Sequence, residues 1–282
     1  MAKILDGKAV ASKLREKQSE NLEILKKSGR IPGLMTLRVG EEKDDIAYES
    51  SVKKRCEKLG INFFSTVLDK DIALSEFKNK IEEINADGGI DGVLPLSPGR
   101  KELSLAVSDM LDYKKDIDGF TDISMAGVFT NKKTGFPPCT ARACMEILDF
   151  YDIDVARKAV TVIGRSLVVG KPLSMMLLNK DATVTVCHSK TENISEVASS
   201  SEILILAVGK AGFATEEFFS PGQTVIDVGT NYIDGKVYGD ADFESAKRIV
   251  GAITPVPGGV GTVTTAVLLT QLIEAAMSKE RS

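Results

Sequence analysis

The chain of 282 residues carries 36 basic and 40 acidic side chains, a formal net charge of −4 at pH 7, and 43% hydrophobic residues. Such a chain is soluble and can bury one large core or two medium ones, and its mild acidity without a basic cluster argues against nucleic acid as a partner. No run reaches the ~18 apolar residues of a membrane span, and the first residues lack a signal-peptide core, so we expect a cytoplasmic protein with no membrane partner.

Helices and strands alternate through the first half of the chain. Helical spacing and short apolar runs predict helices at 7–28, 44–59 and 74–85 and strands at 33–40, 61–68 and 90–96. Strands that alternate with helices form parallel sheets with helices on both faces. The first half is therefore predicted to be an α/β domain of its own.

Residues 160–190 contain a strand, a glycine loop, a helix and a second strand, which is the size of one βαβ nucleotide-binding unit. Five residues separate Gly164 from Gly170, so the loop is neither the GxGxxG fingerprint nor a Walker loop, and Pro172 stands at the Walker Ser/Thr position. The loop precedes a helix N-terminus, which can hold a phosphate. An ordinary βα turn is the alternative interpretation.

Further strands are predicted at 203–208 and 224–228, followed by a Pro/Gly-rich structured turn at 254–261 and an apolar terminal helix.

The cysteine and histidine content limits the chemistry of the whole chain. No CxxC pair occurs, so we expect four reduced packing cysteines, namely Cys56, Cys139, Cys144 and Cys187. His188 is the only histidine, which excludes a multi-histidine metal site, and we expect no metal.

Seven phrases, in order along nearly the whole chain, resemble the FolD-type methylenetetrahydrofolate dehydrogenase/cyclohydrolase family. They are KDIDGF at 115–120, PPCT at 137–140, VIGRSLVVGKP at 162–172, TVTVCHSKT at 183–191, AVGKAGF at 207–213, VIDVGTN at 225–231 and GAITPVPGGVG at 251–261. The resemblance implies an α/β fold with two domains. On this resemblance we expect residues 1–138 to form a βα folate-facing domain, to which a C-terminal helix at 264–282 returns, and residues 139–263 to form a Rossmann-type, parallel-sheet NADP domain.

The family oxidises 5,10-methylenetetrahydrofolate to the methenyl form by hydride transfer, and most members then hydrolyse it to 10-formyltetrahydrofolate. The resemblance thus implies NADP, tetrahydrofolate derivatives, a homodimer, and a place in one-carbon metabolism and purine biosynthesis. The cofactor carries the hydride chemistry, so the protein mainly has to orient the two reactants. Another Rossmann dehydrogenase would need a catalytic His or a Lys/Asp pair, and a non-catalytic folate or nucleotide sensor would keep the fold without the site.

On the family pattern, five residues match cofactor-binding positions. Gly164, Arg165 and Ser166 match the cofactor loop, Ser189 matches a ribose-phosphate contact, and Thr230 matches a backbone contact to the cofactor. The segment at 187–190 that ends the second strand holds no carboxylate for ribose hydroxyls. With Arg165 nearby, this segment favours NADP over NAD.

The remaining matches are on the folate side. Asp118 matches the carboxylate that binds the pterin, although an Asp before Gly119 also caps turns. Tyr48 and Lys54 match the tyrosine and the second basic residue of the family's catalytic helix. A last group matches the loop that closes on the ligands, where glycine permits close backbone approach, namely Pro257, Gly258 and Gly259.

The sequence departs from the family at two catalytic positions. Counting from Tyr48 places Val52 at the catalytic Lys position, and counting from Asp91-Gly92 places Leu96 at the partner Gln position. Neither side chain can transfer a proton or polarise a water. Lys53 lies ~100° further round the helix. We therefore predict weak or absent cyclohydrolase activity; the alternative is a bifunctional enzyme that uses Lys53 or Lys54 from a shifted helix.

Overall fold

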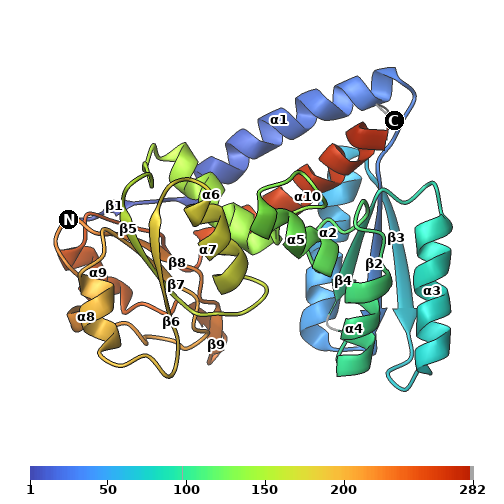
Figure 1. Cartoon of the computed structure of the whole chain (residues 1–282). Coiled ribbons are helices and arrows are strands. Elements are labelled where there is room, and N and C mark those ends of the chain that lie inside the picture. Colours follow the sequence, from blue (N-terminus) through green and yellow to red (C-terminus); the bar gives the residue numbers. More distant parts are fainter. Residues whose placement is uncertain (97, 280–282) are drawn as a thin grey trace. The chain divides into compact units, whose positions relative to one another are not determined.

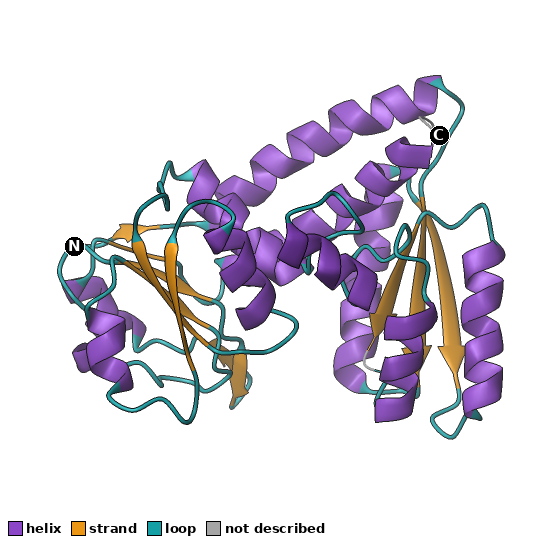
Figure 2. Cartoon of the chain, in the orientation of Figure 1, coloured by secondary structure: helices purple, strands orange, loops and turns teal. Residues whose placement is uncertain are grey.

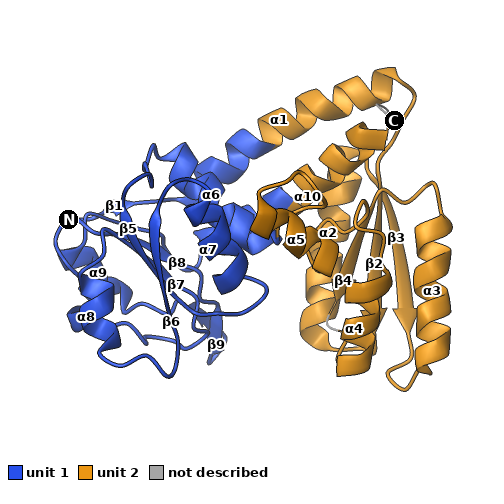
Figure 3. Ribbon diagram, in the orientation of Figure 1, with its two compact units in different colours: residues 1–14, 138–267 blue, residues 15–137, 268–282 orange. Residues whose placement is uncertain are grey.

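The structure is a computed structural model that describes residues 1–96 and 98–279. Figure 1 follows the chain from end to end, and Figure 3 colours its two compact units. Unit 1 comprises Met1–Leu14 and Pro138–Val267, and unit 2 comprises Arg15–Pro137 and Leu268–Ser282. The sequence assigned residues 1–14 to the folate-facing domain, whereas they belong to unit 1. Which residues face the folate and which face the cofactor stays a prediction.

Unit 1 contains a six-stranded, fully parallel sheet in the order β1-β11-β8-β7-β5-β6. Its strands are β1 Lys3–Ile4, β5 Ala159–Ile163, β6 Thr183–Cys187, β7 Ile203–Leu206, β8 Thr224–Asp227 and β11 Ala252–Ile253. The Val- and Ile-rich strands β5, β7 and β8 are almost fully buried, as is typical of parallel strands that helices cover on both faces. The Rossmann-type parallel sheet predicted from the sequence is confirmed.

Helices cover both faces of this sheet, as Figure 2 shows. One face carries α8 Ile194–Ser199, the 3₁₀ helix η1 Glu216–Phe218 and α9 Phe243–Ile249, which pack on a buried apolar cluster of β7, β8 and β11. The other face carries α6 Cys139–Phe150 and α7 Gly170–Leu178. A short antiparallel hairpin, β9 Asn231–Ile233 and β10 Lys236–Tyr238, was not predicted because its strands have three residues each.

Unit 2 contains a parallel three-stranded sheet in the order β3-β2-β4. The strands are β2 Gly33–Val39, β3 Asn62–Leu68 and β4 Gly92–Leu96, and the helices are α2 Lys43–Leu59, α3 Leu74–Ala86, α4 Lys101–Met110 and α5 Asp122–Thr130. Leu37, Val39 and Val93 face α3 and α4 in one buried cluster. Thr36 and Arg38 point to the opposite face, where their side chains contact α2. The predicted helices and strands of this half are confirmed.

Two long helices, α1 Gly7–Lys27 and α10 Val260–Lys279, each contribute residues to both units. In unit 2, Gln18 Nε2 of α1 donates to Thr270 Oγ1 of α10 at 2.9 Å. The C-terminal helix therefore returns to the first half of the chain, as predicted. By length and composition α10 could cross a membrane, contrary to the sequence expectation, but 72% of its apolar window is buried inside the structure, which is typical of a core helix.

Candidate functional site

The predicted cofactor residues of unit 1 follow the carboxyl ends of its strands. Gly164 follows β5, Ser189 lies two residues beyond β6, and Thr230 lies three residues beyond β8. The chain crosses from β5 to β6 on one side and returns to β7 on the other, so β5 flanks the topological switch point of the sheet. Ligands of open α/β sheets bind in the crevice at this point. The structure thus brings Gly164, Ser189 and Thr230 to one edge of the sheet.

The backbone around the loop after β5 leaves no room for side chains at its two glycines. Gly164 has φ +134°, and a Cβ there would lie 2.3 Å from the carbonyl oxygen of Ala207. A Cβ on Gly170 would lie 2.1 Å from the carbonyl oxygen of Gly164. Ser166 Oγ accepts the backbone N–H of Val169 at 3.1 Å, which closes the loop before α7 begins. The sequence GRSLVVG therefore folds into a tight cradle at a helix N-terminus.

Polar and basic side chains around this cradle are exposed. Arg165 and Ser166 are exposed on the loop, and Ser189 and Lys190 are exposed on the turn after β6. That turn is held by a hydrogen bond from the backbone N–H of His188 to Thr191 Oγ1, at 2.9 Å. Guanidinium, ammonium and hydroxyl groups are the partners that a phosphate dianion prefers. The residues present therefore fit a phosphate-bearing dinucleotide.

The loop at 254–261 packs against the start of α1 within unit 1. The backbone N–H of Gly7 donates to the carbonyl oxygen of Gly258 at 2.8 Å. A Cβ on Gly7 would lie 2.2 Å from the carbonyl oxygen of Gly259, and one on Gly259 would lie 2.4 Å from that of Pro255. The glycines thus serve backbone packing, while the predicted closure of Pro257, Gly258 and Gly259 on ligands stays a prediction.

In unit 2, the phrase KDIDGF holds two buried charges with structural partners. Lys115 Nζ donates to three carbonyl oxygens at the end of α3, those of Ile84, Asn85 and Asp87. The pKa of Lys115 is lowered because burial disfavours the ammonium, with a smaller contribution from Lys279. Asp116 is fully buried and accepts four hydrogen bonds, from the Phe120 and Thr121 N–H groups and the Thr121 and Ser124 hydroxyls.

Asp118 differs from both of these residues because its side chain is only half-buried. Gly119 follows it with φ +65°, a conformation that favours glycine. The neighbouring carbonyl group of Ile117 accepts Gln271 Nε2 of α10 at 2.7 Å, which fixes the loop to the terminal helix. The loop therefore presents one carboxyl group, that of Asp118, whose surroundings leave it partly accessible to a ligand.

Helix α2 carries the other folate-side residues predicted from the sequence. Tyr48 is half-buried and Lys54 is exposed, and their spacing of six residues places them on different sides of the helix. Val52 is 0% exposed and Leu96 of β4 is 4% exposed. A lysine at position 52 would therefore be buried, whereas Lys53 is an exposed residue of an unbroken helix.

Strand register places Leu96 on the sheet face that α2 covers. Leu96 pairs with Arg38 in the parallel register of β2 and β4, and paired residues of neighbouring strands point to the same face. Arg38 contacts Glu49 of α2 through an Nε to Oε2 hydrogen bond of 3.1 Å, and Val52 follows Glu49 by one helical turn. The two departures from the family pattern therefore lie on one buried face of unit 2.

Sequence reasoning missed a buried polar network on this same face. Glu49 Oε1 accepts the hydroxyls of Thr36 and Ser65, and Glu49 Oε2 accepts Arg38. Burial works against ionisation of Glu49, but these hydrogen bonds prevail and lower its pKa. The signal in the sequence was the pair of polar residues, Thr36 and Arg38, in the otherwise apolar strand GLMTLRV.

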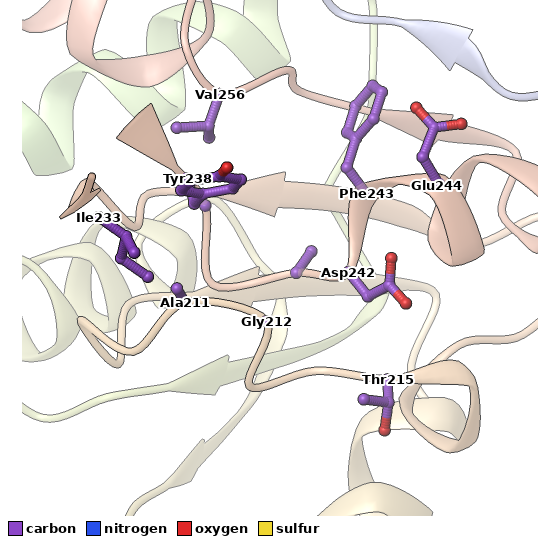
Figure 4. Close-up of a pocket in the computed structure, with 11 residues that line it drawn as sticks. Ala211, Gly212, Thr215, Ile233, Tyr238, Asp242, Phe243, Glu244 and Val256 are labelled. Atoms are coloured by element: carbon purple, nitrogen blue, oxygen red, sulfur yellow. The ribbon is translucent and has the colours of Figure 1, made fainter. Parts of the chain in front are cut away.

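Unit 1 also holds a pocket of about 510 Å³ that sequence reasoning did not anticipate. Figure 4 shows it between the segment after β7, the β9–β10 hairpin and the start of α9. Its lining is Ala211, Gly212, Thr215, Ile233, Tyr238, Gly239, Ala241, Asp242, Phe243, Glu244 and Val256. None of the predicted cofactor residues lines it, so it is separate from the cradle after β5.

The thiols and acidic groups do not suggest a metal centre. All four cysteine side chains are buried, and burial raises the pKa of the Cys56 and Cys144 thiols to about 12. Within residues 1–96 and 98–279, no group of three or more His, Cys, Asp or Glu residues is arranged to hold a metal ion.

Comparisons with known proteins agree with this arrangement. Two models of the tetrahydrofolate dehydrogenase/cyclohydrolase family match the chain, the catalytic domain over residues 5–118 and the NAD(P)-binding domain over residues 138–280. A relative named "Bifunctional protein FolD", from Dictyoglomus turgidum, is 44% identical over 281 residues, which are 99% of this chain and 100% of the relative.

Solved structures show the same likeness. The bifunctional FolD enzyme of Campylobacter jejuni has a TM-score of 0.95 at 34% identity, over 99% of this chain and 100% of its own. The FolD enzyme of Trypanosoma brucei, solved with NADP cofactor and an inhibitor, has a TM-score of 0.92 at 30% identity, over 100% of this chain and 99% of its own. The similarity therefore includes both units.

Proposed function

The chain belongs to the tetrahydrofolate dehydrogenase/cyclohydrolase family, and from this premise we propose that it is an NADP-dependent methylenetetrahydrofolate dehydrogenase of one-carbon metabolism. The carrying observation is the cradle at the β5 switch point of unit 1, where Gly164 and Gly170 admit no side chain. When bound there, NADP supplies the acceptor for the hydride of 5,10-methylenetetrahydrofolate.

The residues of the chain then have binding and orienting roles. Arg165, Ser166 and Ser189 surround the cradle with exposed donors that suit phosphate and ribose, and Thr230 follows the neighbouring strand β8. The half-buried carboxylate of Asp118 in unit 2 binds the pterin. Tyr48 of α2 is the second residue of this unit that binds the folate substrate. The methylene carbon loses a hydride with its electron pair, so this step requires no proton transfer by a side chain.

The test is reduction of NADP followed by absorbance, with methylenetetrahydrofolate as donor and NAD as the competing cofactor. Turnover with NADP that depends on the folate substrate supports the proposal. Binding of folate or NADP without any turnover would instead identify a sensor, and turnover only with a hydroxy acid would identify another dehydrogenase.

We also propose that the cyclohydrolase step is weak or absent. Val52 and Leu96 occupy the positions of the family's Lys and Gln, and both side chains are apolar and buried on one face of unit 2. The alternative uses Lys53 or Lys54, and the unbroken helix from Lys43 to Leu59, on which both are exposed, supports it poorly. The test is the decay of added methenyltetrahydrofolate with and without the protein. Robust hydrolysis by the natural chain contradicts this part of the proposal.

A homodimer in the cytoplasm, with a contribution to purine biosynthesis, completes the proposal. Support for the dimer comes from the β9–β10 hairpin, where Tyr232, Ile233 and Tyr238 are exposed by 74%, 47% and 45%. Exposed apolar clusters of this kind mark protein contacts. Sedimentation equilibrium of the natural chain and of a Tyr232→Ser/Tyr238→Ser variant tests it, because a dimer held elsewhere would survive both substitutions.

A further inference from the structure

Two buried carboxylates of unit 1, those of Asp227 and Asp240, have no role in the proposed chemistry. Asp227 ends β8 and is 2% exposed, and Asp240 follows the β9–β10 hairpin and is 0% exposed. Acidic side chains are almost never fully buried unless they are paired or hydrogen-bonded. Their partners therefore show what the two carboxylates do.

Asp240 holds the segment that follows β7. Its Oδ2 accepts the backbone N–H groups of Val208 at 2.6 Å and Gly209 at 3.0 Å, and its Oδ1 accepts that of Lys210 at 2.9 Å. Oδ1 also accepts Asn231 Nδ2 at 3.0 Å, which adds the first residue of β9. One side chain thus fixes three consecutive backbone amides to the hairpin.

Asp227 holds the segment that follows its own strand. Its Oδ1 accepts the backbone N–H groups of Gly229 and Asp240, both at 2.9 Å, and its Oδ2 accepts that of Ala241 at 2.9 Å. The two carboxylates are therefore linked, because the backbone of Asp240 binds to Asp227 while its side chain binds the segment after β7.

Glycines allow the backbone to close around both carboxylates. A Cβ on Gly229 would lie 2.2 Å from Asp240 Oδ1, and a Cβ on Gly239 would lie 2.0 Å from Asp227 Oδ2. The segments after β7 and β8 and the end of the hairpin are thus packed on the two acids without intervening side chains. Movement of either carboxylate would move all three segments.

These segments lie beside the proposed cofactor site at the carboxyl ends of the strands of unit 1. Ala207, which opens the segment after β7, donates its N–H to Ile163 of β5 at 2.9 Å, and its carbonyl oxygen forms one wall against Gly164 of the cradle. Gly229, held by Asp227, directly precedes Thr230. The linked acids therefore support the backbone on both sides of β7 at the switch point.

We propose that Asp227 and Asp240 are positioning residues of the NADP site, which hold the segments 207–210 and 228–231 in the geometry that the cofactor requires. The proposal rests on the proposed function, because it concerns the same site. Neither acid is a catalytic residue, since both act through the backbone that they bind. Burial raises the pKa of Asp227 to about 6, and the carboxyl of Asp240 acts in the same direction, so the arrangement is costly to keep ionised.

The Asp240→Asn variant separates this role from simple space filling. Asparagine has nearly the same shape, but its amide nitrogen donates where the carboxylate accepts. In either orientation the NH₂ group faces two donors that Asp240 satisfied, so two hydrogen bonds are lost. The matched control is Asp242→Asn, two residues further on, because the Asp242 carboxylate caps the start of α9, where it accepts Ser245 N and Oγ.

The experiment measures the dissociation constant of NADP by calorimetry on the full chain without folate, and then KM for NADP and for methylenetetrahydrofolate. We expect Asp240→Asn and Asp227→Asn to raise the NADP constants at least tenfold, from the loss of bonds to a charged acceptor, with KM for the folate unchanged. Asp242→Asn should bind NADP as the natural chain does. A folded Asp240→Asn protein with natural NADP affinity overturns the proposal, and so does an equal loss in the control.

A milder variant keeps the proposal testable if Asp240→Asn fails to fold. Asn231→Ala removes one side-chain donor from Asp240 and leaves the carboxylate in place. We expect it to fold and to raise the NADP dissociation constant by a smaller factor, and an unchanged constant overturns the proposal. If the natural chain itself binds no NADP, the proposed function fails, and this inference fails with it.

Discussion

Arg38 of β2 and Glu49 of α2 form an ion pair of 3.1 Å whose side chains are only 10% and 12% exposed. The pair ties the helix that carries Tyr48 and Val52 to the sheet of unit 2. Removal of one partner of a buried pair leaves an uncompensated charge, which costs about 3–5 kcal/mol. We expect Arg38→Met to lower the free energy of unfolding by this amount, measured by urea denaturation.

The double variant Arg38→Met/Glu49→Gln is the control for that prediction, because the glutamine amide oxygen can still accept the Thr36 and Ser65 hydroxyls. It removes both charges, so much of the lost stability should return. A single variant as stable as the natural chain would show that the ion pair does not hold α2. The lowered pKa of Glu49 also predicts that its contribution to stability is present near neutral pH and is lost as pH falls through its folded value.

Val52→Lys tests the reason given for the missing cyclohydrolase step. The new ammonium would lie on the buried face of α2, one turn from Glu49, where it could polarise a ligand. We expect faster decay of methenyltetrahydrofolate than with the natural chain, most clearly when Leu96→Gln is added, since proton transfer contributes ~10²–10⁴-fold. Ser51→Lys adds the same charge at an exposed position and should change nothing. Loss of natural hydrolysis in Lys53→Ala would instead assign that role to Lys53.

Arg165→Ala should harm use of NADP selectively. A charge-assisted hydrogen bond contributes about 1.5–3 kcal/mol, so kcat/KM for NADP should fall roughly ten- to a hundredfold while that for NAD changes little. Lys180→Ala, an exposed basic residue just beyond the far end of α7, is the matched control. Equal losses with both cofactors would contradict a phosphate contact by Arg165.

Asp118→Ala should weaken folate binding and leave the fold intact. The expected loss is about 1.5–3 kcal/mol, read from KM and from direct titration with the folate substrate. Asp116→Ala provides the contrast, because its carboxylate satisfies four buried donors and its removal should lower stability first. Natural folate affinity in Asp118→Ala would remove Asp118 from the site.

The pKa of Asp227 makes its contribution to stability depend on pH. Its value in the fold, about 6, exceeds the ordinary 3.8, so the folded chain binds this proton more tightly than the unfolded chain does. The stabilisation is therefore fully present below about pH 4 and is lost as pH rises through about 6. Compared with Asp227→Asn, the natural chain should lose up to about 3 kcal/mol of unfolding free energy across that interval. An unchanged difference, measured by urea denaturation at fixed ionic strength, would contradict the raised pKa.

The sequence by itself determined the alternation of helices and strands, because apolar periodicity and glycine positions are local properties. It also located the cradle at Gly164, since the run VTVIG ends a strand and a glycine loop then leads into a helix. Its phrases further indicated the family and the cofactor. Short elements such as the β9–β10 hairpin were not predicted, because a strand of three residues is too short to show apolar periodicity.

Only the tertiary structure decided which acidic side chains are fully buried and which are partly exposed. Asp116 and Asp118 are two residues apart in KDIDGF, yet Asp116 is fully buried and accepts four hydrogen bonds from residues 120–124, whereas Asp118 is half-buried. Asp227 and Asp240 lie thirteen residues apart, and the backbone N–H of Asp240 donates to Asp227 while the Asp240 side chain accepts the backbone N–H of Val208 after β7. Hydrogen bonds of this kind depend on strand order and backbone closure, which no local sequence pattern records.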